Sequence, residues 1–426
     1  MQCLFLQPKS FTSTRTKAWL LLMLCSVVSP AWADMTEPAN LTLQQAFNLT
    51  LQANPDMAVA QREREAMQGV QTQAAVRINP SLATSIQDTR SANRQTYVQL
   101  NQEIELGNKR QARMDVAASQ VNKATAALAQ QQAESHANVI SAFYTVLVAQ
   151  QRLLIAQSSA DIAVMARDAA SKRVKAGKSA PVEETKANIE SVSASIELNQ
   201  AAAQLASSRQ RLAALWGNAL PQFEQADGDV TQLPALLSLA ALSTLIEQAP
   251  AIQLAKLEIA TRSAMTSVER SKATPNVIVS AGFVNNQELG GINQALLGLS
   301  VPIPVFDRNQ GGLQEAVSRQ YKAQDELAAL RNHLASNLAV QYQRYSASKQ
   351  AAEALTTQIL PSAHSAFSVA NKGFSAGKFG FLEVLDAQRT LFQVQSQYIQ
   401  TLSEAHQALA EIERMLGDVL HHSAQS

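Results

Sequence analysis

Two carboxylates near the C-terminal end of the chain stand where they could act on cations. Glu383 and Asp386 are three residues apart at the predicted start of a helix, so their side chains share one face of it. If identical subunits repeated this pair around an axis, two rings of negative charge would attract cations and resist closure of a pore. The alternative is ordinary helix chemistry, because the helix dipole stabilises carboxylates near an N-terminus.

The histidines form no catalytic or metal-binding set. Those that stand alone on predicted helices are His136, His333, His364 and His406. His406 falls at an apolar heptad position, which favours packing or a pore-facing position over metal ligation. His421-His422 near the end of the chain could hold a metal only weakly. No nucleophile, base and orienting group come together, so the sequence predicts no enzyme, no cofactor and no built-in metal site.

The N-terminal residues are typical of an export signal. Three basic residues precede the apolar run 19–28, and the small-x-small sequence Ala31-Trp32-Ala33 follows it. The run is well short of the roughly 20 residues that span a bilayer as a helix. We therefore expect a signal peptide at residues 1–33. Its cleavage would remove both cysteines, Cys3 and Cys25, and leave no disulfide and no thiolate ligand.

The composition favours long helices and argues against a nucleic-acid partner. The chain has 426 residues, of which 16% are charged, against roughly 25% in typical soluble domains. It has only 15 glycines and 13 prolines, and 35 basic residues balance 34 acidic ones. Beyond residue 33 no stretch approaches 18 consecutive apolar residues, so no transmembrane helix is predicted. Alternating strands could still cross an outer membrane.

Short motifs recur in the same order in the two halves of the chain and indicate an internal duplication. The pairs are QANP at 52–55 with EQAP at 247–250, Asn79-Pro80 with Thr274-Pro275, Ala176-Gly177-Lys178 with Ala376-Gly377-Lys378, and Leu215-Trp216-Gly217 with Met415-Leu416-Gly417. We expect a first repeat at 34–217, a linker at 218–240, a second repeat at 241–417 and a tail at 418–426. The linker is expected to pack on the outside of the helices.

Each half contains two strand-like runs with alternating apolar and polar residues. They lie at 81–88 and 97–106 in the first half, and at 276–284 and 293–305 in the second. One apolar face and one mostly polar face suit a membrane barrel with lipid outside and water inside. Four strands cannot close a barrel, because the smallest need about eight, so several chains would have to share one. The alternative is a sheet or hairpin in a soluble domain.

The rest of each half is predicted to be helical. A first helix of about 25 residues should stop at Asn79-Pro80 or Thr274-Pro275, since proline and the residue before it disfavour helix. Long helices are expected at 108–176 and 313–360, the second kinked at Pro361. The returning helices are expected at 182–216 and 381–416. Narrow heptad seams, such as Leu198, Leu205 and Leu212, indicate coiled-coil packing that leaves polar faces wet.

Taken together, these parts resemble the TolC-like outer-membrane efflux factors over nearly the whole mature chain. The sharpest motif is AGKFGFLEVLDAQ at 376–388, which is similar to the family's second periplasmic turn and the helix that carries its gate. The sequences QEIELGNKR at 102–110 and VPIPVFDRNQG at 301–311 resemble the heavy-metal, CzcC-like branch, whose members serve cobalt, zinc, cadmium, nickel or copper pumps.

The resemblance implies a mainly α fold with a transmembrane β-barrel. Three identical chains would each give four strands to one outer-membrane barrel, which continues as a barrel of antiparallel coiled-coil helices across the periplasm. This homotrimer would be a passive exit duct for divalent heavy-metal cations. Its partners would be a periplasmic adaptor (membrane fusion) protein, an inner-membrane RND pump and outer-membrane lipid.

The resemblance also suggests which residues serve the gate and the adaptor. Glu383 and Asp386 match a pair of acids at the family's gate, while Phe374 and Phe379 stand where better-known members have a tyrosine and an arginine that brace the closed state. The expected adaptor docking residues lie at the tips of the two helical hairpins: Gly177, Lys178, Gly377 and Lys378. For these turns, simple helix punctuation with solvated lysines is an equally sufficient explanation.

Two other functions are compatible with the sequence. The same duct could serve drug efflux or type I protein secretion. The chain could also be a structural coiled-coil envelope protein without a pore, in which case no heat-stable trimer would form in the outer membrane.

Overall fold

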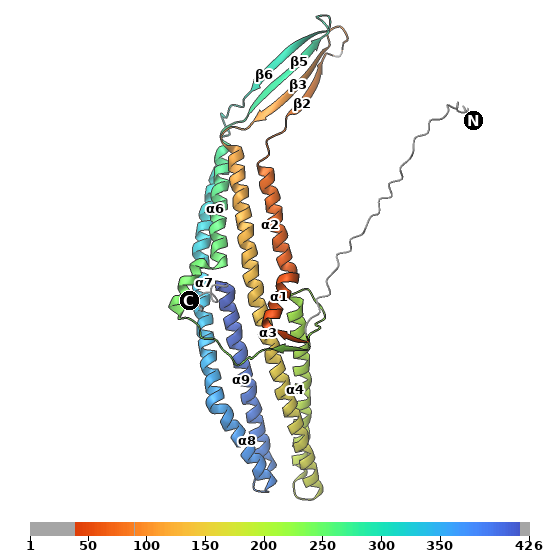
Figure 1. Cartoon of the computed structure of the whole chain (residues 1–426), viewed down its shortest axis with the longest axis vertical. Coiled ribbons are helices and arrows are strands. Elements are labelled where there is room, and N and C mark those ends of the chain that lie inside the picture. The colour runs from red at the N-terminus through yellow and green to blue at the C-terminus, as the bar shows by residue number, and fades with distance from the viewer. Residues whose placement is uncertain (1–38, 89, 418–426) are drawn as a thin grey trace, which may run out of the picture. The chain divides into compact units, whose positions relative to one another are not determined.

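The computed structural model describes residues 39–88 and 90–417, which belong to one compact unit. The predicted signal peptide at 1–33 with its two cysteines, the tail at 418–426 and His421-His422 lie outside the described residues. The described part is mostly helical and carries one four-stranded sheet (Figure 1).

The long helices occupy the predicted stretches. In the first half these are α2 (Pro55–Ala74), α3 (Lys109–Lys175) and α4 (Pro181–Ala214); in the second they are α6 (Pro250–Ser271), α7 (Gln310–Ala354), α8 (Leu360–Ser375) and α9 (Phe381–Leu416). The α3 helix runs for 67 residues without interruption. Its length follows from the absence of glycine and proline between Asn108 and Ala176, since no residue in that stretch breaks the backbone hydrogen bonds.

The four strands form one antiparallel sheet in the order β2-β3-β5-β6. The strands are β2 (Ser81–Gln87), β3 (Gln95–Ile104), β5 (Val277–Asn286) and β6 (Ile292–Ser300). They lie within or beside the four predicted runs, but β6 ends at Ser300 instead of continuing to residue 305. Pro302 and Pro304 explain the early end, because proline has no N–H to donate to a strand ladder.

The central pair β3 and β5 joins the two halves of the chain. Val98 lies opposite Phe283 and Leu100 opposite Ala281 on one face of the sheet. At Gly282 a side chain would not fit, since an added Cβ would come within 2.1 Å of the Val98 carbonyl oxygen. The sheet grows from the ends of α2, α3, α6 and α7, so the four helices that lead to and from it share one end of the unit (Figure 1).

The first predicted helix is two helices, α1 (Leu43–Ala53) and α2. Asn54 separates them, and its Oδ1 accepts hydrogen bonds from the backbone N–H groups of Asp56 (2.7 Å) and Met57 (3.1 Å). Pro55 takes the first position of α2, where its missing N–H costs nothing. The α2 helix also ends at Ala74, before the predicted stop at Asn79-Pro80.

The irregularity predicted at Pro361 is present and takes a specific form. One wide turn of π-helix (Leu355–Ile359) separates α7 from α8, and Pro361 lies in the first turn of α8. A π turn changes the spacing of the backbone hydrogen bonds locally. The helix can therefore accommodate Pro361, which has no N–H to donate, and continue into α8.

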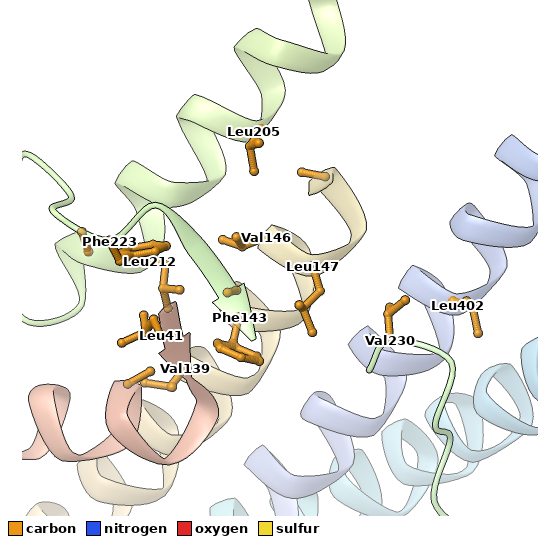
Figure 2. Close-up of a cluster of buried hydrophobic side chains, with 14 of the residues drawn as sticks. Leu41, Val139, Phe143, Val146, Leu147, Leu205, Leu212, Phe223, Val230 and Leu402 are labelled. Carbon is orange, nitrogen blue, oxygen red and sulfur yellow. The ribbon is translucent and has the colours of Figure 1, made fainter. Parts of the chain in front are cut away.

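The main core lies where α3 meets α1, α4, α9 and the linker. Figure 2 shows Val139 and Phe143 of α3 beside Leu41, Leu212 and Phe223, all of them nearly inaccessible to solvent. By length and composition, the α3 helix also contains a stretch that is apolar enough to cross a membrane. Within the protein 39% of this apolar stretch is buried, so packing explains part of its apolar character.

The linker is a structural part of this core and more than an outer covering. Its strand β4 (Gln225–Asp227) pairs in parallel with β1 (Asn40–Thr42), a pairing that the sequence did not predict. Phe223 and Val230 of the linker are buried. The remaining short elements, α5 (Leu239–Leu245) and the 3-10 turn Ile246–Gln248, lead from the linker into α6.

His406 fastens the linker to the helices. Its side chain is buried on α9, its ring stacks on Tyr144 of α3 at 3.6 Å between centroids, and its Nε2 donates to the Val230 carbonyl oxygen at 2.8 Å. Nδ1 has no hydrogen-bond partner among the described residues. Burial lowers the pKa of His406, although the bond to Val230 and the charge of Asp229 act in the opposite direction.

We expect the protein to lose stability as the pH falls below neutrality, in part through His406. Because the folded state lowers its pKa, this contribution is full above the unfolded-state value of about 6.5 and is lost as the pH falls toward the folded value. Thermal unfolding of the purified protein at about pH 8 and about pH 5 measures the change.

His406→Gln should show a smaller drop in midpoint between the two pH values than the parent. His333→Gln is the control, because His333 is exposed on α7. Equal drops in parent and His406→Gln would contradict this role for His406.

Candidate gate and docking tips

The two helical hairpins end in turns of the same geometry. Gly177 between α3 and α4 has φ +66°, and Gly377 between α8 and α9 has φ +72°, both in the left-handed region. In each turn the following lysine N–H bonds back to the carbonyl five residues earlier, at 2.8 Å for Lys178 to Arg173 and for Lys378 to Gly373. This is a Schellman ending, which glycine makes without strain. An added Cβ would meet nothing at either glycine, so the constraint is the backbone angle.

Both turns present a lysine to solvent. Lys178 and Lys378 are exposed, and neither ammonium group has a hydrogen-bond or ion-pair partner among the described residues. Both lysines are among the residues predicted to dock the adaptor. The structure places them at equivalent points of two hairpins.

The two hairpins touch near their tips through a small apolar cluster. Phe381 and Leu385 of α9 pack against Ala170 of α3 and Ala187 of α4. Small alanines at these positions let the three helices approach closely, so the cluster fixes how the start of α9 lies against the other hairpin.

Phe374 is held within the chain. Its ring lies 5.8 Å from that of Phe381, and the Arg173 guanidinium carbon lies 4.7 Å above its centre. A cation over an aromatic face is attracted to the ring electrons. Phe374 therefore links α8 to α3 within one chain, a contact that the sequence pattern did not predict.

Phe379 lies on the surface of the second turn and packs back onto it. It is partly exposed, and an added Cβ at Gly373 would come within 2.1 Å of its ring. Glycine at 373 thus makes room for this phenylalanine. The two phenylalanines have different surroundings: Phe374 bridges two hairpins, whereas Phe379 covers its own turn.

Glu383 and Asp386 both lie on the exposed face of α9, opposite the buried Val384 and Leu385. Glu383 is in the first turn, with its carboxylate close enough to Gly380 that an added Cβ there would be 2.7 Å from Oε2. The helix dipole can stabilise this carboxylate. Asp386 is one turn further on, where that effect fades, so the dipole explains Glu383 better than it explains Asp386.

An ion pair that sequence reasoning missed lies beside these acids. The Arg389 guanidinium on α9 donates to Oε2 of Glu190 on α4, through Nη2 and, at 3.1 Å, through Nε. Glu190 raises the pKa of Arg389, first through the hydrogen bond and then through its charge, and Asp386 adds to this. The sequence could have indicated Arg389 as part of the site, because it lies three residues after Asp386. It could not have indicated Glu190, which lies 199 residues from Arg389 in sequence.

Among residues 39–88 and 90–417, no group of three or more His, Cys, Asp or Glu side chains could hold a metal ion. His136 stacks on Phe47 at 4.0 Å between ring centroids, and its Nδ1 lies 4.0 Å from Oε2 of Glu413. The described histidines with resolved contacts therefore serve packing between helices. The arrangement at the tips offers exposed carboxylates and lysines, which can interact with passing ions or with a protein surface.

The sequence pattern of the outer membrane efflux protein family matches residues 46–218 and again 241–418. The chain is 43% identical over 377 residues to the cobalt-zinc-cadmium resistance protein CzcC of Cupriavidus metallidurans, covering 88% of this chain and 90% of CzcC. A shorter match, 34% over 90 residues, joins 21% of this chain to 20% of the nickel-cobalt-cadmium resistance protein NccC of Alcaligenes xylosoxydans xylosoxydans.

Solved structures share the fold at lower identity. A membrane protein from Pseudomonas aeruginosa superposes with a TM-score of 0.77 at 20% identity, covering 88% of this chain and 93% of its own. CusC superposes with a TM-score of 0.72 at 19% identity, covering 87% of this chain and 90% of its own. From its two family matches and its likeness to CzcC, this chain belongs to the outer membrane efflux protein family, in the CzcC-like heavy-metal resistance branch that its motifs indicated.

Proposed function

We propose that the chain is one subunit of a trimeric exit duct through which divalent heavy-metal cations leave the cell. Membership of the family places it in the outer membrane, with its helices in the periplasm. The proposal that the cargo is divalent heavy-metal cations rests on the 43% identity to a cobalt-zinc-cadmium resistance protein over nearly the whole chain. Within this proposal the chain is a passive conduit, and the energy for transport comes from elsewhere.

The trimer is supported by the open edges of the sheet. Strands β2 and β6 each pair on one side only, with β3 and β5 respectively, within the described chain. In lipid an unpaired edge leaves backbone N–H and C=O groups without partners, at a cost of several kcal/mol each. Pairing β6 of one copy with β2 of the next removes every edge, and three copies of four strands give a barrel of twelve.

The sheet also has the two faces that such a barrel requires. Leu82, Leu100 and Ala281 lie side by side across β2, β3 and β5, and Leu297 continues the row on β6. The opposite face carries Gln99, Asn101 and Ser280 among others. We assign the first face to lipid and the second to the water-filled lumen.

Two repeats at 34–217 and 241–417, joined by the linker at 218–240, best explain the organisation of the chain. Support comes from the family pattern matching twice and from the equal turns at Gly177 and Gly377. Left-handed Asn108 and Asn309 likewise precede the long helices α3 and α7. Duplication gives each subunit two strand pairs and two helical hairpins. A trimer would therefore have six similar units around its axis and nearly sixfold symmetry.

The duct requires partners at the periplasmic end. We propose that a periplasmic adaptor contacts the hairpin tips at Gly177, Lys178, Gly377 and Lys378, and that an inner-membrane RND pump supplies the cations. Lys178 and Lys378 support this assignment, because both are exposed and neither is paired within the part of the chain that the structure describes, so they are available to acidic groups on another protein.

We further propose that Glu383 and Asp386 form the gate, with Phe374 and Phe379 bracing it. Three copies around an axis would place two rings of carboxylates at the narrow end. The support is their common exposed face on α9 and the absence of a first-turn explanation for Asp386. The cluster of Phe381 and Leu385 behind them holds this part of α9 in place.

A strain without the gene should become sensitive to divalent metals, because cations would no longer leave through the duct. Growth on cobalt, zinc, cadmium, nickel and copper salts, compared with growth on hydrophobic drugs, measures the cargo. Restoring the gene should restore growth. Sensitivity to drugs with unchanged growth on metals would contradict the metal assignment and favour a drug duct.

Replacing both gate acids, Glu383→Ala with Asp386→Ala, should change leak conductance in bilayers or vancomycin entry into cells several-fold, because it removes the rings of negative charge that attract cations and repel one another at the gate. Glu183→Ala with Glu184→Ala is the matched control, since these acids lie in the first turn of α4 at the equivalent point of the first repeat. Leakage equal to that of the control would count against the gate.

Reversing the charge of both tip lysines, Lys178→Glu with Lys378→Glu, should weaken crosslinking to the adaptor in intact cells, because an attractive contact becomes repulsive. Lys172→Glu with Lys372→Glu changes the same charge at exposed positions 200 residues apart but further up the hairpins, and should crosslink normally. Undiminished crosslinking of the tip variant would refute docking through these lysines.

A further inference from the structure

A short apolar segment follows the last strand and is almost bare of contacts. The 301–306 segment, Val301 to Phe306, connects β6 to α7 and is assigned neither helix nor strand. Ile303 is 82% exposed and Phe306 is 92% exposed in the single chain. Two large apolar side chains so fully exposed within one short segment mark a surface that contacts something else.

The segment extends the apolar face of the sheet. On β6 the side chains of Leu297 and Leu299 point to that face and are 84% and 71% exposed. Val301 and Ile303 continue the same alternation past the end of the strand. Whatever covers Leu297 and Leu299 therefore continues to the 301–306 segment.

A strand from a second copy cannot be the cover here. Pro302 and Pro304 have no N–H groups, so the ladder that would pair β6 with another strand cannot continue past them. The Val305 N–H turns back to the Ile303 carbonyl oxygen at 2.9 Å. The remaining carbonyl groups need water, which places the segment at the boundary of a bilayer and outside its hydrocarbon centre.

A cation follows the apolar residues directly. Arg308 is exposed, and its Nε donates to the Pro304 carbonyl oxygen at 3.2 Å, which holds the guanidinium beside the segment. Neighbouring Asp307 is engaged by the chain itself, since its Oδ1 accepts from the Asn309 N–H at 2.8 Å. An aromatic residue with an arginine two positions later fits a membrane surface, where the ring sits at headgroup level and the charge meets phosphate.

The segment is fixed to a rigid base. Asn309 starts α7, and its Nδ2 donates to the backbone carbonyl oxygen of Glu269 on α6 at 2.9 Å and to its carboxylate at 2.7 Å. The exit from the sheet is therefore tied to two helices. A segment held in this way can set the depth at which the helices begin.

We propose that the 301–306 segment is a membrane-surface anchor, with Ile303 and Phe306 among the phospholipids of the periplasmic leaflet and Arg308 at their phosphates. The inference rests on the proposed function, because it requires the apolar face of the sheet to meet lipid. The inference adds to the proposed function the position of the bilayer boundary, which it places between the end of β6 and the start of α7.

Single tryptophans on the full-length protein test the anchor. The chain has three tryptophans, two in the predicted signal peptide, and the third, Trp216, is buried in the helical core and serves as background. The variants are Phe306→Trp, Leu297→Trp on the lipid face of β6, and Gln294→Trp on its opposite face. Each heat-stable trimer is placed in phosphatidylcholine vesicles brominated either near the headgroup or deep in the acyl chains, and fluorescence is measured.

Phe306→Trp should be quenched by the shallow bromines to an extent comparable with Leu297→Trp, and less by the deep ones. Gln294→Trp and the parent should stay bright. If bromine quenches Leu297→Trp but not Phe306→Trp, the proposed anchor is wrong. In that case, quenching of Phe306→Trp by iodide would show that residue 306 is exposed to water. Protection from iodide would show that a second copy covers it. If Leu297→Trp is also unquenched, the lipid-facing barrel itself is wrong.

Discussion

The constraint on which this molecule depends is that backbone groups in lipid must be hydrogen-bonded within protein. A sheet of four strands with β2 and β6 open cannot meet it alone. The repeated halves of the chain and the open sheet edges are consistent with several copies pairing their strands, so that no backbone group in lipid stays unpaired. Two halves of the chain meet at the β3-β5 pair, where Gly282 allows the backbones to approach, and identical copies can close the remaining edges.

In the duct that we propose, the helices face the opposite problem, because they would surround water without a continuous apolar core. They pack through small residues, as Ala170 and Ala187 do near the tips, and concentrate large side chains at a few levels. The main level is the one at which the linker crosses α3 and α9, with Phe143 and Val230 buried and His406 joining the layers. Between these levels the helices keep polar faces, which a wall around water requires.

Sequence patterns predicted the regular parts well and the contacts between distant parts poorly. Alternation located the four strands, and the lack of glycine and proline located α3. The break at Asn54, the β1-β4 pairing and the Arg389–Glu190 ion pair were missed. Each depends on a cap or a tertiary contact that local pattern does not encode. For the same reason, pattern could name Glu383 and Asp386 as candidates but could not say that Phe374 lies under Arg173.

A duct for metal cations should bind them weakly, since an ion held tightly cannot leave. Tight sites for transition metals need several histidine, thiolate or carboxylate ligands around one point. The described chain has no such group, and its exposed acids on α9 stand without a histidine beside them. In the gate that we propose, rings of carboxylates would raise the local cation concentration and still release each ion. Under the proposed function, the duct would have only to favour positive charge over negative.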